Sequence, residues 1–267
     1  MLAVLVFFIS SLSFGQGKGK STKEGYVGAE TCKGCHPEVY DLFQKDPHRG
    51  KECESCHGPG AKHAEAGGQG MILSFKNRST RERSDTCLNC HDKQKKFFQS
   101  TRGVHQLSAV GCDDCHQVHT QQVAKKLLKQ KDPDLCFSCH GDVKAKFYLP
   151  NNHRVIQGAV KCSDCHTPHG TRTRASLRQI NKFDTDVCYQ CHPEKRGPWV
   201  FEHQSKKFEG CGVCHTPHGS ANRFMLIRSN PRALCMECHG VVHFGQFACT
   251  NCHTQIHGSN FSSRFFQ

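Results

Sequence analysis

The sequence lacks the features on which most membrane and sheet-based proteins are built. Beyond residue 15 no apolar run is long enough to span a bilayer, which argues against a transmembrane segment in the mature chain. Segments with the alternating polar and apolar pattern of strands are absent, so little or no β-structure is expected. The formal net charge is +13, yet no stripe of aromatic residues follows the spacing of a nucleic-acid-binding module. We therefore expect no nucleic-acid partner.

Cysteine and histidine, by contrast, are abundant and follow one pattern. The 267 residues include 20 cysteines, and all of them fall into pairs of the form C-x-x-C followed at once by histidine. No cysteine is left over. The motifs are Cys32/Cys35/His36, Cys53/Cys56/His57, Cys87/Cys90/His91, Cys112/Cys115/His116, Cys136/Cys139/His140, Cys162/Cys165/His166, Cys188/Cys191/His192, Cys211/Cys214/His215, Cys235/Cys238/His239 and Cys249/Cys252/His253.

This pattern is the signature of covalent haem attachment. Disulfide frameworks and zinc ribbons also pair cysteines, but neither requires histidine at the same position in every pair. In a c-type cytochrome each thiol bonds a haem vinyl group, and the adjacent histidine ligates the iron. The sequence therefore predicts ten covalently bound haem c groups. Their propionates, about twenty negative charges, offset the excess of lysine and arginine and take the oxidised protein to about +3 once the ferric irons are counted.

The first residues predict export. Residues 1–15 (MLAVLVFFISSLSFG) contain an apolar run that ends in small residues, as in a secretory signal peptide. Covalent haem attachment takes place outside the cytoplasm, which agrees with this interpretation. Residues 16–29 then form an N-terminal linker to the first motif.

The repeating unit of the chain holds two motifs. An acidic residue stands two positions before the first motif in most units (Glu30, Asp85, Asp134, Asp186), and an aromatic stands seven positions after its histidine (Phe43, Phe98, Phe147, Trp199). The repeat defines five dihaem modules at 30–64, 85–119, 134–169, 186–218 and 233–257, followed by a C-terminal tail at 258–267. So few residues serve each haem that the porphyrins must supply most of the buried surface, with the aromatics against them. We expect an elongated array of modules, mostly coil, with short helices at 37–45 and 121–130.

Ten further histidines lie outside the motifs, and each half-module holds one. The middle histidines, between the two motifs of a module, are His48, His105, His153, His203 and His243; the trailing histidines, after the second motif, are His63, His119, His169, His218 and His257. Their number matches one second ligand for each iron, whereas the four methionines do not recur once per haem. We therefore expect all twenty histidines to ligate iron. An iron with both faces occupied cannot bind a substrate, so the sequence predicts an electron-transfer protein and no enzyme.

Chain length restricts which haem a trailing histidine can reach. The two residues between His166 and His169 span about 10 Å at most, too little to pass round the macrocycle, so His169 must ligate another haem. In a first scheme the trailing histidine ligates the first haem of its own module, and the middle histidine ligates the second. In a second scheme the middle histidine ligates the first haem, and trailing histidines ligate second haems of neighbouring modules. We favour the first because five closed modules need no ligand from a partner chain. It assigns His169 to the haem of Cys136 and Cys139.

Several strings carry a resemblance to a known family. GAETCKGCH, CESCHGPGAKH, the repeated CHTPHG and CTNCHTQIHGSN resemble the MtrA/DmsE/PioA-type periplasmic decahaem c-type cytochromes, from about Gly28 to Asn260. The resemblance implies a periplasmic electron conduit that inserts into an outer-membrane β-barrel porin and exchanges electrons with extracellular or periplasmic redox proteins. Two alternatives remain open: a polymerising extracellular cytochrome filament and a multihaem reductase.

Overall fold

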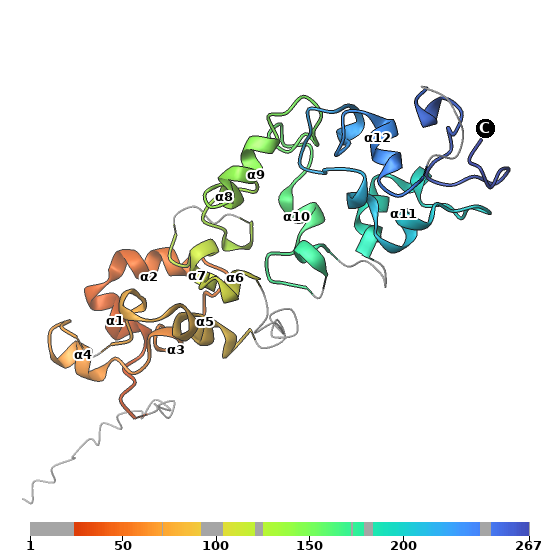
Figure 1. Ribbon diagram of the computed structural model, residues 1–267. Coiled ribbons are helices and arrows are strands. Elements are labelled where there is room, and N and C mark those ends of the chain that lie inside the picture. The colour runs from red at the N-terminus through yellow and green to blue at the C-terminus, as the bar shows by residue number, and fades with distance from the viewer. Residues whose placement is uncertain are drawn as a thin grey trace, which may run out of the picture. The chain divides into compact units, whose positions relative to one another are not determined.

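The computed structural model describes residues 24–70, 72–91, 104–120, 125–171, 173–178, 184–240 and 247–266. Its helices are short and are joined by irregular chain (Figure 1). The α-helices are α1 (Ala29–Cys35), α2 (Pro37–Gln44), α3 (Glu54–His57), α4 (Ala61–Glu65), α5 (Thr80–Leu88), α6 (Val104–Leu107), α7 (Cys112–Cys115), α8 (Asp134–Phe137), α9 (Gly141–Lys146), α10 (Cys162–Cys165), α11 (Gln204–Phe208) and α12 (Pro231–Met236). The predicted signal peptide, Phe98 and His243 lie outside the described residues.

Tight 3-10 turns make up the rest of the regular structure. They are η1 (Phe75–Asn77), η3 (Lys125–Leu127), η4 (Arg174–Ser176), η5 (Asp184–Gln190), η6 (Pro193–Lys195), η7 (Cys211–Val213), η8 (Arg223–Met225) and η9 (Cys249–Asn251). The described residues form isolated β-bridges, such as His116 with Leu128, and no strand. The predicted fold class, mostly coil with short helices and little β-structure, is confirmed for this part of the chain.

One of the two predicted helices is present and the other is not. The helix expected at 37–45 is α2, which begins at Pro37, a residue suited to the first helical position because no N–H is needed there. The helix expected at 121–130 is wrong over its described part. There the chain forms η3, in which Lys126 and Leu127 have φ of 65° and 57°. Two left-handed residues in succession cannot belong to a right-handed helix.

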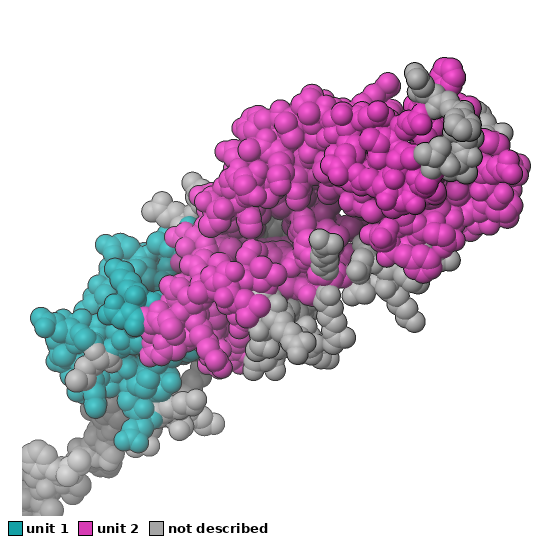
Figure 2. All heavy atoms as spheres, viewed as in Figure 1, with its two compact units in different colours: residues 1–77, 119–121 teal, residues 78–118, 122–267 magenta. Residues whose placement is uncertain are grey.

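The chain divides into two compact units, drawn in different colours in Figure 2. The first holds residues 1–77 and 119–121, and the second holds 78–118 and 122–267. His119 therefore packs with the first unit, although it follows a motif of the second.

The described residues bury few apolar side chains. The buried hydrophobic residues are Phe43, Leu127, Phe147, Val155 and Val187. A chain of this length would ordinarily bury many more. The deficit agrees with a core completed by large planar cofactors. No helix in the described part of the chain is both long and apolar enough to cross a membrane.

Candidate haem-binding sites

Each motif folds as one closed turn. In all ten, the backbone N–H of the motif histidine donates to the carbonyl oxygen of the first cysteine, at 2.8–3.1 Å. This bond between positions i and i+4 is that of a single helical turn. It carries both thiols and the imidazole on a short, rigid segment, which suits attachment at two points of one macrocycle. All twenty cysteines are free of disulfides.

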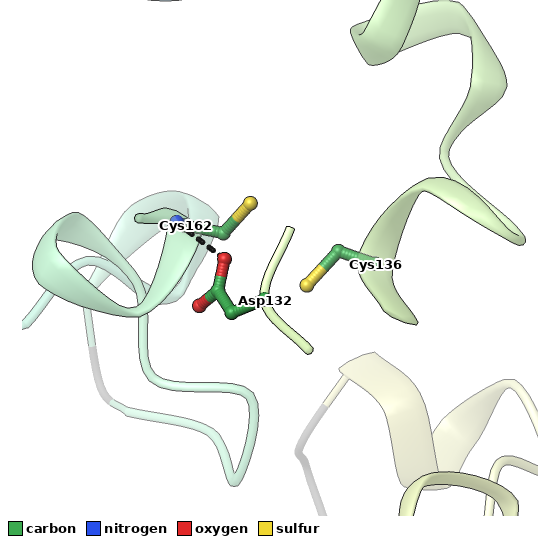
Figure 3. A group of neighbouring side chains, drawn as sticks. All are labelled: Asp132, Cys136 and Cys162. Carbon is green, nitrogen blue, oxygen red and sulfur yellow. Dashed lines mark hydrogen bonds between the residues drawn. The ribbon is translucent and has the colours of Figure 1, made fainter. Parts of the chain in front are cut away.

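Within a module, the first cysteines of the two motifs lie next to each other. In the third module the thiols of Cys136 and Cys162 and a carboxylate oxygen of Asp132 lie within 4.8 Å of one another (Figure 3). The same contact appears in the second module, where a hydrogen bond with Cys87 lowers the pKa of Cys112 to about 6. The corresponding pairs in the other modules are Cys32 with Cys53, Cys188 with Cys211 and Cys235 with Cys249.

Between modules of the second unit, the second cysteines of successive motifs are neighbours. Burial raises the pKa of the Cys165 thiol, and the charges of Asp164 and Cys191 raise it further. Burial likewise raises the pKa of Cys214, and Cys238 contributes the largest of the charge effects. Successive motifs of this unit therefore adjoin in their order along the chain, alternately through first and second cysteines.

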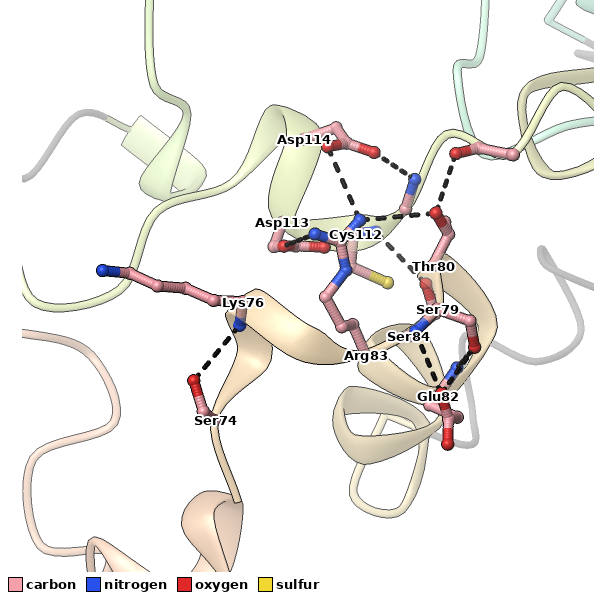
Figure 4. Close-up of polar contacts among 12 residues, drawn as sticks. Ser74, Lys76, Ser79, Thr80, Glu82, Arg83, Ser84, Cys112, Asp113 and Asp114 are labelled. Carbon is pink, nitrogen blue, oxygen red and sulfur yellow. Dashed lines mark hydrogen bonds and ion pairs between the residues drawn. The ribbon is translucent and has the colours of Figure 1, made fainter. Parts of the chain in front are cut away.

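Polar side chains hold the two motifs of a module together. In the second module, Ser84 on α5 accepts a hydrogen bond from the backbone N–H of Cys112 at 3.4 Å (Figure 4). Arg83, also on α5, pairs with Asp113 at 3.1 Å. A capping box formed by Ser79 and Glu82 begins the helix. Because α5 also carries Cys87, these contacts fix the second motif against the first.

In the third module an aspartate makes the same junction. Asp132 accepts hydrogen bonds from the backbone N–H groups of Cys162 at 2.9 Å and Ser163 at 3.0 Å, the N-terminal turn of α10. Burial alone would raise the pKa of Asp132, but these hydrogen bonds outweigh it and lower the pKa below its usual value.

In the first module the junction has the opposite polarity, because its carboxylate belongs to the second motif. Glu54 is 2% exposed and accepts from the backbone N–H groups of Val27, Gly28 and Gly60, at 2.8–3.1 Å. It thereby ties the segment before α1 to the motif of Cys53 and Cys56.

Within the described part of the chain, eight spare histidines lie next to a motif histidine. In the first unit, His63 lies beside His36 with ring centres 6.3 Å apart, and His119 lies beside His57 at 6.1 Å. The pairs in the second unit are His105 with His140, His116 with His169, His153 with His192, His166 with His218, His203 with His239 and His215 with His257, at 5.9–6.3 Å.

These separations fit an iron between the rings. Two imidazoles on opposite faces of one metal have ring centres about 6 Å apart, since a metal–imidazole bond is about 2 Å and each ring centre lies about 1 Å beyond the nitrogen. All eight pairs fall in this range, and each motif histidine is fixed next to two cysteines. The residues therefore fit haem c, with the cysteines holding the macrocycle and the paired histidines closing both faces of the iron.

The pairing corrects the favoured ligand scheme. A trailing histidine was expected to serve the first haem of its own module, but only His63 lies in that position among those described. His169 lies beside His116 of the preceding module, so its assignment to the haem of Cys136 and Cys139 is wrong. His119, His218 and His257 likewise lie beside the second-motif histidine of the preceding module. These four trailing histidines lie where the second scheme expected them, beside second-motif histidines of a neighbouring module.

The middle histidines follow neither scheme, because they reach forward along the chain. His105 lies beside His140, which is the first-motif histidine of the next module. The same contact occurs in the next two modules, where His153 lies beside His192 and His203 lies beside His239. Each boundary between successive modules in the second unit is thus crossed in both directions. A middle histidine reaches forward across it, and a trailing histidine reaches back.

Burial favours the neutral form of four trailing histidines. It lowers the pKa of His119, His169 and His218, and brings that of His257 to about 4. A metal ligand must offer a nitrogen lone pair, so a neutral imidazole is the form that binds iron.

The second motifs of the second, third and fourth modules orient their histidines with a left-handed turn that sequence reasoning missed. The Nδ1–H groups of His116, His166 and His215 donate to the carbonyl oxygens of Lys126, Ala175 and Phe224, at 2.8 Å each. Each acceptor has a positive φ, as does the residue after it. Fixing Nδ1 as the donor leaves Nε2 for the metal. No glycine or asparagine marks these turns in the sequence, which is why they were not predicted.

The same turns divide the cysteines by exposure. All ten first cysteines are half-buried, and so are the second cysteines of the three motifs that carry the left-handed turn, Cys115, Cys165 and Cys214. In each of these motifs the chain returns after the turn, and a backbone N–H group from it donates to the carbonyl oxygen of the second cysteine, at 2.8–3.0 Å. The returning segment therefore covers that side of the motif.

The remaining second cysteines are exposed, although all were predicted to bind haem; they are Cys35, Cys56, Cys90, Cys139, Cys191, Cys238 and Cys252. In Cys90 and Cys252 the backbone N–H still closes the motif turn, at 3.2 and 3.3 Å from the carbonyl oxygen of the first cysteine. Free cysteine is ordinarily among the most buried residues, so the chain alone does not enclose these sites. A thiol that bonds the edge of a macrocycle is covered by the macrocycle instead. Haem attachment at all twenty cysteines stays a prediction.

The repeated aromatic packs against a trailing histidine of the next module. The ring centre of Phe43 lies 5.6 Å from that of His119, edge to face, and Phe147 lies 5.5 Å from His218. In the fourth module Trp199 lies under Gly258, directly after His257, where an added Cβ would collide with the indole. The aromatics were expected to pack against haem; the structure gives them the further task of holding the imidazole that crosses the junction.

Residues after the last two trailing histidines lock these contacts. Ser220 exchanges backbone hydrogen bonds with Asn151, at 2.8 and 3.2 Å. Ser259 does the same with Phe201, at 2.8 and 2.9 Å, and its side chain is buried. The predicted C-terminal tail is thereby folded onto the fourth module.

Known proteins are similar to this chain in sequence. The family model of the doubled CXXCH motif matches residues 105–145, 153–197 and 203–244, and that of cytochrome c554 and c-prime matches 31–117. Multiheme cytochrome MtrA of Shewanella baltica is 37% identical over 274 residues, which cover 88% of this chain and 80% of that protein. The cytochrome c-type protein NrfB of Escherichia coli is 32% identical over 42% of this chain and 60% of its own. The C-type polyheme cytochrome OmcB of Geobacter sulfurreducens is 25% identical over 66% of this chain and 28% of its own.

The chain has paired C-x-x-C-H turns and pairs of imidazoles at the spacing of two ligands on one metal. These features define a multihaem c-type cytochrome, a class of electron-transfer protein. Within that class the chain belongs to the family of MtrA-type multihaem cytochromes.

Proposed function

We propose that the chain carries ten c-type haems, that every iron has two histidine ligands, and that the haems conduct electrons between the periplasm and the extracellular side of the outer membrane. The observation that carries the proposal is the set of eight histidine pairs at the spacing of a shared metal. The middle histidines His48 and His243 and the motif histidines His91 and His253 complete the set of twenty ligands. With both faces of each iron closed, only electrons enter and leave.

The bound haems would supply reversible one-electron chemistry, and the residues that hold them determine between which haems an electron can pass. The cysteines hold adjacent macrocycles at neighbouring sulfur atoms, 4.8 Å apart or less for Cys136 and Cys162. The shared junction histidines keep successive modules in contact. We propose that electrons pass from haem to haem in the order of the motifs.

The family resemblance supports a cellular location and a partner for this protein. We propose that the chain is exported by the signal peptide at 1–15, resides in the periplasm in association with the outer membrane, and works inside an outer-membrane β-barrel porin. Extracellular or periplasmic redox proteins would be its electron partners. Eight spare histidines find partners within the chain, which favours this assignment over a filament whose subunits exchange ligands.

Three measurements on the protein purified from its secreting host test the proposal. Mass spectrometry should give the mass of the mature chain plus ten haems, and the oxidised absorption and EPR spectra should show low-spin iron throughout. A sizeable high-spin fraction would contradict complete bis-histidine ligation and favour a reductase. Mild detergent extraction of outer membranes should co-purify the chain with a barrel protein; long fibres in electron micrographs would instead favour a filament.

A further inference from the structure

His48 differs in its Nδ1 partner from nine other described histidines that hydrogen-bond through Nδ1. The His48 ring donates its Nδ1–H to Oδ1 of Asp46, at 2.7 Å, and the backbone N–H of His48 donates to the same oxygen at 2.8 Å. Two hydrogen bonds from one residue to one carboxylate oxygen hold the imidazole in a fixed orientation. With Nδ1 as the donor, Nε2 is the nitrogen through which His48 would ligate a metal.

Nine other histidines hydrogen-bond a neutral group through Nδ1, either a backbone carbonyl or the hydroxyl of Ser205. His192 lies 3.9 Å from a carboxylate oxygen of Glu194, which is beyond hydrogen-bond distance, and both side chains are more than half exposed. The carboxylate at His48 is therefore a different electrostatic environment from that of the carbonyl-bonded imidazoles.

Asp46 is also buried, with 1% of its side chain exposed. Its second oxygen, Oδ2, has no hydrogen-bond partner among the described residues. A buried carboxylate is costly unless a positive centre lies nearby. A ferric iron ligated by His48 would provide such a centre, and the benefit would shrink when an electron neutralises it.

We propose that Asp46 is a positioning residue that lowers the reduction potential of the iron ligated by His48. The inference rests on the proposed ligand role of His48. A carboxylate that accepts from Nδ1–H makes the imidazole a stronger electron donor, and its buried charge opposes the arrival of an electron. Hydrogen bonds to charged groups are stronger than neutral ones by about the amount that changes an equilibrium constant tenfold, which for a one-electron couple is about 59 mV.

The test compares the wild-type protein with Asp46→Asn, which keeps an Oδ1 acceptor and removes the charge. Potentiometric titration followed by absorbance and EPR should show one component of the ten move upward by about 59 mV, the tenfold change in reduction equilibrium, with a changed low-spin EPR signal. Glu194→Gln serves as the matched control and should leave the titration unchanged. Asp46→Ser provides a second neutral variant should Asp46→Asn not assemble with its full set of haems.

Two further outcomes separate the possible failures. If His48→Ala leaves every iron low-spin, His48 is not a ligand, and both the ligand assignment and this inference are wrong. If His48→Ala produces one high-spin iron while the neutral Asp46 variants titrate as the wild type does, the proposed function stands and the inference about Asp46 is overturned.

Discussion

The first module and the later modules place their trailing histidines differently. In the first, His63 lies on α4, six positions after the motif histidine His57, and its ring lies beside His36 of the same module. In the third, His169 follows His166 by three positions, in a turn closed by a hydrogen bond from the Gly170 N–H to the Thr167 carbonyl oxygen at 3.1 Å, and lies beside His116 of the module before. The spacer Gly58-Pro59-Gly60 accounts for the difference: Gly58, at φ 71°, ends α3, and the chain then enters α4.

This difference shows how an interlocked series can begin. In the second unit the first-motif histidine of a module lies beside the middle histidine of the module before it, as His140 does with His105. In the first module, His36 lies beside the trailing histidine of its own module instead. The first module thus resembles the capping repeat of a repeat protein, which closes a surface that inner repeats leave for a neighbour.

Removing a trailing histidine should have the largest effect, because it should remove a ligand from one iron. We expect His169→Ala to leave one iron with a single histidine, visible as a high-spin absorption band and EPR signal. The open iron should be that of Cys112 and Cys115, in the module before. Adding Cys112→Ala and Cys115→Ala to His169→Ala should therefore abolish the high-spin signal, whereas adding Cys136→Ala and Cys139→Ala should leave it.

His63→Ala provides the contrasting case. Its high-spin iron should disappear when Cys32 and Cys35 are also replaced by alanine, because His63 serves its own module. A high-spin signal that survives that replacement would remove the distinction between the first module and the rest.

The next largest effect should come from disturbing the contact between Gly258 and Trp199, which lies next to the trailing histidine His257. Gly258 has φ 151° and a Cβ added there would collide with the ring of Trp199. We expect Gly258→Ala to destabilise the fourth and fifth modules by about 2–4 kcal/mol and to loosen His257 from its iron. Thermal unfolding followed by circular dichroism, with the high-spin band as a second readout, measures both effects.

A glycine with open space around it is the matched control. An added Cβ at Gly141, the first residue of α9, meets nothing within 4 Å. Gly141→Ala should unfold at or slightly above the wild-type temperature, since alanine favours the helix. Equal losses in the two variants would mean that the collision with Trp199 is not the cause.

The features that could be predicted from the sequence are those determined by residues close together in the chain. The C-x-x-C-H turns, the spare histidines and the start of α2 at Pro37 depend on residues within a few positions of one another. Chain length alone predicts that His169 does not ligate the haem of its own motif. In the structure His169 lies beside His116 and not His166.

The choice between modules could not be made locally, and there the prediction failed. The favoured scheme assumed that each module closes on itself, whereas contacts such as Phe147 with His218 and Ser220 with Asn151 join residues about seventy positions apart. The left-handed turns at Lys126 and Ala175 were missed for another reason. Lysine and alanine rarely adopt positive φ, so only the hydrogen bond from the motif histidine explains why they do so here.

A smaller effect should distinguish the two polarities of the motif junction. Glu54→Gln replaces a buried carboxylate that faces three backbone N–H donors, so an amide N–H group must point at a donor. We expect a loss of about 2–3 kcal/mol. Asp132→Asn removes a more exposed carboxylate with two donors and should cost about 1 kcal/mol. Urea unfolding at pH 7 measures both. Asp142→Asn, on the exposed side of α9, should match the wild type.

The smallest effect is the pH dependence of the Asp132 junction. The folded protein lowers the pKa of Asp132 below its ordinary value of 3.8. A carboxyl group with a lowered pKa stabilises the fold above that ordinary value, and the contribution is lost as pH falls through the folded pKa. The difference in urea midpoint between wild type and Asp132→Asn should therefore be constant from pH 7 to about pH 5 and shrink below the ordinary pKa of 3.8. A difference that persists unchanged well below that pH would show that the loss in Asp132→Asn arises from packing and not from the ionised carboxylate holding α10.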